Sequence, residues 1–296
     1  MKKIKKEDIT QEVFDLYDDY AHNKLERRQF IEKLSLYAVG GLTVPTLLSF
    51  MSPNYKNTAV VKSDDNRITS QYITYDSPKG AGVMKGLLSK PVNTANNKLP
   101  GVIVVHENRG LNPYIEDVCR RTAVEGFLSL APDALTPLGG YPGNDDDGRK
   151  LQRQRDRNKM LQDFIAAYTY LKNHRNCNGK IGVVGFCFGG WIANMMAVNI
   201  PELGAAVPYY GRQPEDEDAK KIKSPLLLHY AELDTRVNSG WPKYEAVLER
   251  NNSNYDVFIY PKVNHGFHNN TTPRFDQKAA YLSWQRTIKF LKKYLF

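Results

Sequence analysis

Positions 180–190 read Lys-Ile-Gly-Val-Val-Gly-Phe-Cys-Phe-Gly-Gly, in which a β-branched run leads into a glycine turn around Cys187. A helical pattern follows from Trp191 to Val198. In such a strand-to-helix elbow the nucleophile sits on a strained turn, and its neighbours must be small because other backbone passes close by. The helix N-terminus also favours a thiolate over a thiol. The segment therefore predicts a nucleophilic cysteine above an α/β sheet, with a buried structural cysteine beside a tight turn as the alternative.

Short apolar runs alternate with helical patterns on both sides of this elbow. Runs typical of buried parallel strands lie at 101–105, 127–130, 181–184, 205–207, 226–229 and 257–260. Helical spacing of apolar residues follows Pro113 and recurs at 161–171 and 281–291. Strands regularly separated by helices predict an α/β fold, with a mostly parallel central sheet and helices on both faces.

The composition excludes several classes of protein. The chain has 296 residues, 41% of them hydrophobic, which suffices for one large α/β domain or two small ones and excludes disorder and fibrous repeats. Three cysteines are too few for a disulfide framework. The formal net charge is +9, but nothing resembles a stacking platform interleaved with arginine, so no nucleic-acid partner is expected.

A cysteine nucleophile needs a base, and the base needs an acid that orients it. In α/β-hydrolases the acid and then the histidine follow the nucleophile, on loops at the ends of later strands. Asp234 and His265 follow two successive strand runs in this order. Taken alone, Asp234 could simply cap a turn, and His265 could be an ordinary loop histidine. Glu232 is the competing candidate for the acid, and His268 is the competing candidate for the base. Together the placements predict a triad of Cys187, His265 and Asp234.

No metal or cofactor is expected from the spacing of histidines and cysteines. His265-x-x-His268 and His174-x-x-Cys177 have ligand-like gaps, but no third ligand completes either set, and a metal needs three or four. Cys119 on an apolar helix face and Cys177 in a polar turn are most simply structural.

Several segments together resemble the dienelactone hydrolase (carboxymethylenebutenolidase) family over residues 70–296. They are 104–111 (VVHENRGL), 131–133 (APD), 185–190 (GFCFGG), 233–234 (LD) and 264–267 (NHGF). The resemblance implies an α/β-hydrolase fold and a hydrolase that opens small esters or lactones with a Cys-His-Asp triad, through an acyl-enzyme. The alternative is a non-catalytic thiol or binding protein on the same fold.

The resemblance also implies roles for residues around Cys187. Glu107, just after an early strand, would contact the cysteine and control its ionisation; the alternative is a loop glutamate paired with Arg109. The backbone N–H groups of Phe188 and Asn108 would form the oxyanion hole.

The substrate pocket departs from the family pattern. The best-known members bind a substrate carboxylate with two arginines, and the one past the triad histidine is missing here, which puts dienelactone itself as the substrate in question. Arg155, Arg212 and Trp241 are pocket candidates. Residues 149–180 hold nine Lys/Arg against two Asp, and we expect part of this charge to steer a small anionic substrate toward Cys187.

Residues 1–60 are an addition to the hydrolase-like domain expected at 61–296, and they are predicted to be partly helical. Arg27-Arg28 precede an uncharged run at 34–51, which resembles a twin-arginine export signal. Pro45 interrupts that run, and the alternative is an amphipathic helix packed on the main domain or on a partner subunit. The run is borderline for a membrane span, so no stable span is expected. Export and a cytoplasmic location both stay open, as does the oligomeric state.

Overall fold

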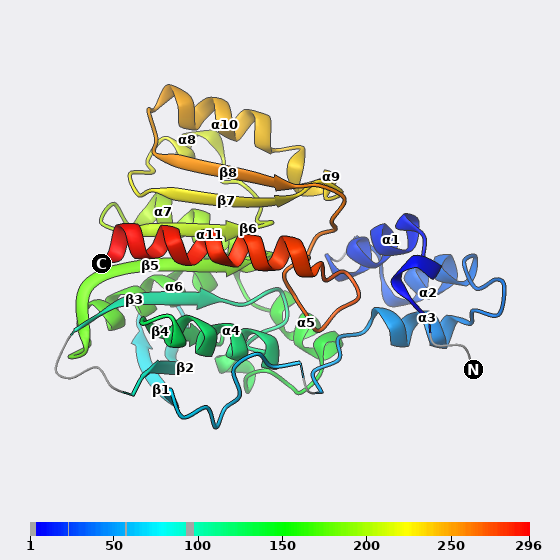
Figure 1. The fold of residues 1–296 in the computed structure, drawn as a ribbon, viewed down its shortest axis with the longest axis horizontal. Coiled ribbons are helices and arrows are strands. Elements are labelled where there is room, and N and C mark those ends of the chain that lie inside the picture. Colours follow the sequence, from blue (N-terminus) through cyan, green and yellow to red (C-terminus); the bar gives the residue numbers. More distant parts are fainter. Residues whose placement is uncertain (1–3, 23, 57, 93–97) are drawn as a thin grey trace.

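The computed structural model describes residues 4–22, 24–56, 58–92 and 98–296 of the chain, and Figure 1 shows their fold. The described strands form one eight-stranded sheet in the order β1-β2-β4-β3-β5-β6-β7-β8. Their bounds are β1 Ile68–Ser77, β2 Gly82–Pro91, β3 Leu99–Val105, β4 Leu128–Pro132, β5 Cys177–Phe186, β6 Ala205–Tyr209, β7 Leu226–Ala231 and β8 Tyr255–Tyr260. From β4 across to β8 all neighbouring strands are parallel, which confirms the predicted mostly parallel sheet.

A hairpin of β1 and β2, which the sequence pattern did not predict, extends one edge of the sheet. β2 pairs antiparallel with both β1 and β4. The edge strand β1 mixes buried and exposed side chains, so it lacks the continuous apolar run that marks a strand covered on both faces. Each of the six predicted strands is present and overlaps its expected range.

Helices cover both faces of the sheet, as expected. The main covering helices are α4 (Pro113–Val124), α6 (Arg157–Lys172), α7 (Phe188–Asn199), α10 (Trp241–Arg250) and α11 (Gln277–Leu295), and the shorter ones are η2 (Thr136–Leu138), α5 (Asp145–Arg153), α8 (Asp216–Ala219) and α9 (Thr235–Asn238). Side chains of α4 and α11 share one apolar cluster with the sheet, and those of α6, α7 and α10 share another. α4 begins at Pro113, and the side chain of Asn112 caps it by accepting a hydrogen bond from the Ile115 N–H at 3.1 Å.

The N-terminal segment folds as a small helical unit with an apolar cluster of its own. It comprises η1 (Lys6–Asp8), α1 (Gln11–Ala21), α2 (Arg27–Ser35) and α3 (Val44–Met51). Phe30 is 1% exposed, and its ring stacks on that of Tyr20 with the centroids 4.4 Å apart. Pro45 lies in the first turn of α3, where proline starts a helix rather than breaking one.

This helical unit, called the extension below, lies beyond the carboxyl ends of the parallel strands (Figure 1). Ligands bind at that end of open α/β sheets, so the extension is placed where it can contribute to a site. Among the described residues, no helix is both long and apolar enough to cross a membrane. The domain boundary near residue 60 stays a prediction.

Candidate active site

Cys187 occupies the strained turn that its sequence motif predicts. It lies between β5 and α7 with φ 58° and ψ −111°, a backbone conformation that is rare outside glycine. A Cβ atom on Gly185 would lie 1.9 Å from the carbonyl oxygen of Gly189, and one on Gly189 would lie 2.3 Å from that of Val105. Both flanking positions therefore require glycine, and the turn presents the Cys187 thiol at the carboxyl end of the sheet.

His265 and Asp234 form a hydrogen-bonded pair beside this turn. His265 Nδ1 lies 2.5 Å from Asp234 Oδ2, and the two side chains are 5% and 2% exposed. Asp234 follows β7 and also caps α9 by accepting from the Val237 N–H at 3.2 Å, so the turn-cap interpretation and the triad placement hold together. A ring nitrogen of His265 lies within 4.8 Å of the Cys187 sulfur. The structure thus brings the three predicted triad residues together.

The competing acid and base are engaged elsewhere. Glu232 Oε2 accepts a hydrogen bond from the Lys262 N–H at 2.7 Å. His268 Nδ1 lies 2.6 Å from the hydroxyl of Tyr114, and burial lowers the pKa of His268 well below its usual value. The geometry therefore favours Asp234 over Glu232 as the acid and His265 over His268 as the base.

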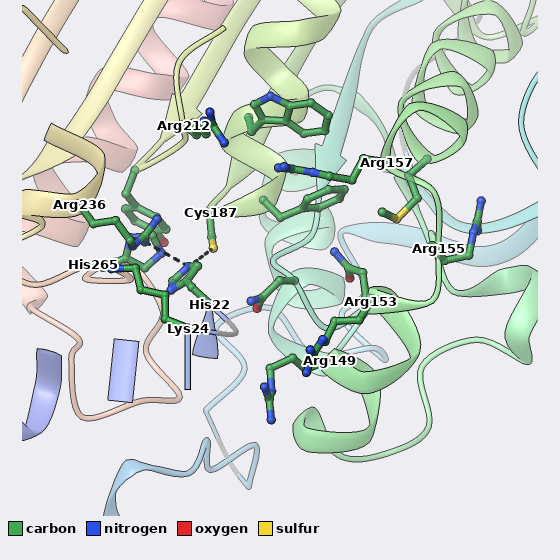
Figure 2. A pocket seen from close by; sticks show the side chains of 16 residues that line it. His22, Lys24, Arg149, Arg153, Arg155, Arg157, Cys187, Arg212, Arg236 and His265 are labelled. Carbon is green, nitrogen blue, oxygen red and sulfur yellow. Dashed lines mark hydrogen bonds between the residues drawn. The ribbon is translucent and has the colours of Figure 1, made fainter. Parts of the chain in front are cut away.

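A second histidine, His22 at the end of α1, contacts the nucleophile directly (Figure 2). His22 Nε2 lies 3.2 Å from Cys187 Sγ. On the other side of the ring, Nδ1 lies 2.8 Å from the backbone oxygen of Asp18 and 3.2 Å from its Oδ1. The rings of His22 and His265 meet edge to face, with the centroids 4.7 Å apart. No sequence motif pointed to His22, because its role depends on how the extension docks onto a turn 165 residues away.

Charged groups surround this pair of histidines. Arg236 Nη2 lies 3.2 Å from His22 Nε2 and 3.3 Å from His265 Nδ1, and Arg236 Nε donates to Asp18 Oδ2 at 3.0 Å. Burial alone would raise the pKa of Asp18, but His22, His265 and Arg236 together hold that pKa well below its usual value. Asp18 is therefore charged in the neutral pH range and sits beside His22 as an anion.

The pKa of His22 reflects the same contacts. Burial would lower it, but the Asp18 carboxylate and the Cys187 sulfur outweigh burial and raise the pKa of His22 above its usual value. His22 is therefore a stronger base than an ordinary buried histidine, and its Nε2 faces the thiol.

The thiol opens into a cavity of about 400 Å³ with a cationic wall. Figure 2 shows Arg157, Arg212 and Arg236 on the side of Cys187, and Arg149, Arg153 and Arg155 farther along the cavity. The basic lining residues are Lys24, Arg149, Arg153, Arg155, Arg157, Arg212 and Arg236. Met160, Phe188 and Trp191 supply apolar surface, and among the described lining residues none is acidic. Such a cavity suits a small ligand that carries both an apolar part and negative charge.

The three predicted pocket residues have different surroundings. Arg155 lines the cavity, but its guanidinium is 7% exposed and donates to Asp163 Oδ2 at 2.7 Å. Arg212 lines the cavity and is 64% exposed. Trp241 is not among the residues that line this cavity: it lies in the core, where its ring centroid is 5.4 Å from that of Tyr230 and where it starts the apolar face of α10.

The residues implied by the family resemblance lie close to the elbow. Glu107 is 5% exposed and accepts a hydrogen bond from Asn269 Nδ2 at 3.0 Å, whereas Arg109 pairs with Asp145 at 2.5 Å. Asn108 lines the cavity and donates from Nδ2 to the backbone oxygen of Ala21 at 2.6 Å, which ties the end of α1 to the site. Phe188 opens α7 directly after the nucleophile. The regulatory role of Glu107 and the oxyanion hole stay predictions.

His22, Cys187 and His265 also form a set that could hold a metal ion. Their three ligand atoms lie within 4.8 Å of one another, and imidazole with thiolate is a donor set that Zn²⁺ accepts. However, Arg236 Nη2 lies 3.2 Å from the nitrogen that would bind the ion. Its positive charge opposes a cation there, so the arrangement suits proton transfer better than metal binding.

The chain is similar to known proteins over most of its length. A model of the dienelactone hydrolase family matches residues 84–295, and a model described as YqhI-like matches residues 1–40. The "Putative hydrolase fragment YghX" of Escherichia coli K12 is 53% identical over 115 residues, which are 39% of this chain and 97% of that protein. A "Putative carboxymethylenebutenolidase" of Saccharolobus solfataricus is 31% identical over 259 residues, which are 75% of this chain and 97% of the relative.

Solved structures agree with these relatives. A crystal structure titled "Putative Dienelactone Hydrolase" from Klebsiella pneumoniae superposes with a TM-score of 0.67 at 25% identity, covering 76% of this chain and 100% of that one. Together with the sheet order and the nucleophile elbow, the family match shows that the chain belongs to the dienelactone hydrolase family of the α/β-hydrolase superfamily and is a hydrolase of the ester or lactone type.

Proposed function

We propose that the protein hydrolyses small, negatively charged esters or lactones through a Cys187-His265-Asp234 triad and an acyl-enzyme. The observation that carries this proposal is the buried His265–Asp234 pair beside the Cys187 elbow, at the wall of a cationic cavity. A non-catalytic thiol protein would need neither the strained turn nor an oriented histidine next to the sulfur.

The reaction follows from the chemistry of these groups. The Cys187 thiolate attacks the carbonyl carbon, and the N–H groups of Phe188 and Asn108 stabilise the negative oxygen of the tetrahedral intermediate. Collapse of the intermediate breaks the bond from the carbonyl carbon to the leaving oxygen and forms a thioester on Cys187. An ester releases its alcohol at this step, whereas the hydroxyl group of an opened lactone stays attached to the acyl group. His265, oriented by Asp234, then takes a proton from the water that attacks this thioester, and the acid is released.

The charge of the cavity supports an anionic substrate. Seven basic side chains line it, and none of its described lining residues is acidic. Arg157 also stacks over the ring of Trp191, 4.4 Å from its centroid, so a charged and an apolar surface meet next to the nucleophile. A lactone or ester that carries a carboxylate would use both.

The test is covalent capture together with turnover. Wild-type protein is mixed with a p-nitrophenyl ester and with a lactone, and the acyl adduct is located by mass spectrometry. We expect turnover and an adduct on Cys187, both lost in Cys187→Ala, while Cys177→Ala, a change at another buried cysteine, keeps both. No activity on a broad panel of esters and lactones, or equal activity of Cys187→Ala, would contradict the proposal.

The anionic class is tested separately by salt. Attraction by a cationic cavity weakens as ionic strength rises. Turnover of an anionic ester should therefore fall more steeply with salt than turnover of its neutral analogue. Equal salt dependence of the two esters would remove the charge preference and leave the triad untouched.

A further inference from the structure

The hydrogen bond of the Cys187 thiol runs to the extension rather than to the predicted triad histidine. Among the described residues its partner is His22 Nε2 at 3.2 Å, whereas the buried Nε2 of His265 has no hydrogen-bond partner. We propose that His22, held by Asp18, takes the thiol proton of Cys187 and returns it to the leaving group, while His265, held by Asp234, serves the hydrolytic water. This inference rests on the proposed function, since it divides the work of that one site.

The two histidines have the same arrangement. Each has a carboxylate at Nδ1, at 3.2 Å for His22 and 2.5 Å for His265. A carboxylate at Nδ1 fixes the tautomer in which Nε2 accepts a proton. His22 directs that nitrogen to the sulfur. The Nε2 of His265 has no hydrogen-bond partner, and His265 lies on the lining of the cavity from which the hydrolytic water would come.

The extension is fixed to the domain at the point where His22 enters the site. Asn108 Nδ2 donates to the backbone oxygen of Ala21 at 2.6 Å, and Arg149 Nη1 donates to that of Tyr20 at 3.1 Å. At the start of the same helix, Gln11 Nε2 lies 2.5 Å from Asn264 Oδ1, in the residue that precedes His265. Contacts at both ends of α1 thus set the position of His22 over the sulfur.

The charges around His22 support proton transfer. The groups that face it are Asp18, Cys187, His265 and Arg236. Arg236 opposes a proton on His22, but the Asp18 carboxylate binds Arg236 at 3.0 Å and offsets that charge. Arg236 lines the same cavity as Cys187, and its positive charge there favours a thiolate over a thiol. The product of the transfer, a thiolate beside an imidazolium, is therefore compensated on both sides.

The steps balance as follows. The proton moves from Sγ to His22 Nε2, the sulfur bonds to the carbonyl carbon, and the bond from that carbon to the leaving oxygen breaks as the oxygen takes the proton from His22. Water then gives a proton to His265 Nε2 while its oxygen attacks the thioester carbon. The carbon–sulfur bond breaks, the sulfur recovers that proton from His265, and one ester and one water have become one acid and one alcohol.

The test separates formation of the thioester from its hydrolysis in the full-length protein. The variants are His22→Gln, His265→Gln and, as a control within the extension, a change of the exposed Lys33 to alanine. Two quantities are measured: the rate of alkylation of Cys187 by iodoacetamide across pH, and the rates of thioester formation and decay with a p-nitrophenyl ester.

For His22→Gln we expect thioester formation to slow about 10²-fold. The midpoint of its alkylation profile should move up toward that of an unassisted thiol, about pH 8.5. For His265→Gln we expect alkylation close to wild type and a thioester that accumulates. Lys33→Ala should match wild type in every rate. If His22 had only a structural role, a His22→Gln protein that melts at the wild-type temperature would keep the wild-type midpoint of Cys187 alkylation.

Two outcomes overturn the inference without touching the proposed function. One is that His22→Gln alkylates and acylates like wild type; the other is that His265→Gln loses both. If wild type itself forms no thioester and turns nothing over, the proposed function fails instead. Should His22→Gln unfold, Asp18→Asn decides: an upward shift of the alkylation midpoint supports the inference, and an unchanged profile overturns it.

Discussion

The two histidine–carboxylate pairs at Cys187 are alike in chemistry and different in origin. His265 and Asp234 lie on loops at the ends of neighbouring strands, so the sheet that positions the nucleophile also positions them. His22 and Asp18 come from α1 and its end, outside the segment that matches the hydrolase family, and His22 lies 3.2 Å from the same sulfur. One pair is therefore tied to the fold, and the other depends on docking between two parts of the chain.

The largest expected effect comes from removing each carboxylate in turn. Asp234→Asn should lower kcat/KM for an ester about 10³-fold, because the amide no longer holds His265 in its working tautomer. Asp18→Asn should lower it only about tenfold, because the backbone oxygen of Asp18 still accepts from His22 Nδ1 at 2.8 Å. Steady-state kinetics with melting temperatures as the folding control measure both. Equal losses of kcat/KM would mean that the two histidine–carboxylate pairs matter equally for turnover. A larger loss in Asp18→Asn than in Asp234→Asn would mean that the pair on the extension matters more.

An intermediate effect is expected in the pH dependence of stability. The pKa of His22 is raised in the folded protein, so this residue stabilises the fold. The stabilisation is fully present below the pKa of His22 in the unfolded chain, about 6.5, and is lost as pH rises through the pKa in the folded protein. The pKa of Asp18 is lowered in the folded protein, so its charged form also stabilises the fold. This stabilisation is present above the pKa of Asp18 in the unfolded chain, about 3.9, and is lost as pH falls through the pKa in the folded protein. The docked extension should therefore be most stable between about pH 4 and 6.5.

The measurement is the melting temperature of wild type and of His22→Gln across this range. The difference between them should be largest below about pH 6.5 and should shrink at higher pH, where His22 loses its proton. His174→Gln, a change at a histidine outside the site, is the control. A difference that grows with pH would contradict the assigned direction of the His22 shift.

The smallest effect is expected at Arg212, which lines the cavity but contacts neither pair. It is 64% exposed, so water screens its charge and Arg212→Gln should raise KM for an anionic ester only a few-fold, leaving a neutral ester unchanged. Lys150→Gln, a change at an exposed basic residue outside the described cavity lining, should change the KM of neither ester. A loss of kcat on both esters would place Arg212 in the chemistry rather than in substrate attraction.

The sequence could predict what depends on strand order. Cys187, Asp234 and His265 each follow a strand, so parallel pairing alone gathers them at one end of the sheet. It could not predict His22, because nothing local to a helix says which surface the helix will cover. Nor could it place Trp241, because an aromatic residue suits a pocket or a core equally, and only its packing against Tyr230 at the start of α10 distinguishes them.

The buried ion pair of Arg155 and Asp163 links the cavity wall to the far edge of the sheet. Asp163 Oδ1 accepts from Ser77 Oγ at 2.6 Å and from the Ala81 N–H at 2.9 Å, at the turn of the β1–β2 hairpin. A methyl group on Gly80 in that turn would lie 2.0 Å from the same oxygen. The hairpin and the substrate cavity are therefore mutationally coupled: a library that varies the turn also perturbs the arginine that lines the cavity, so the two regions should be engineered as one unit.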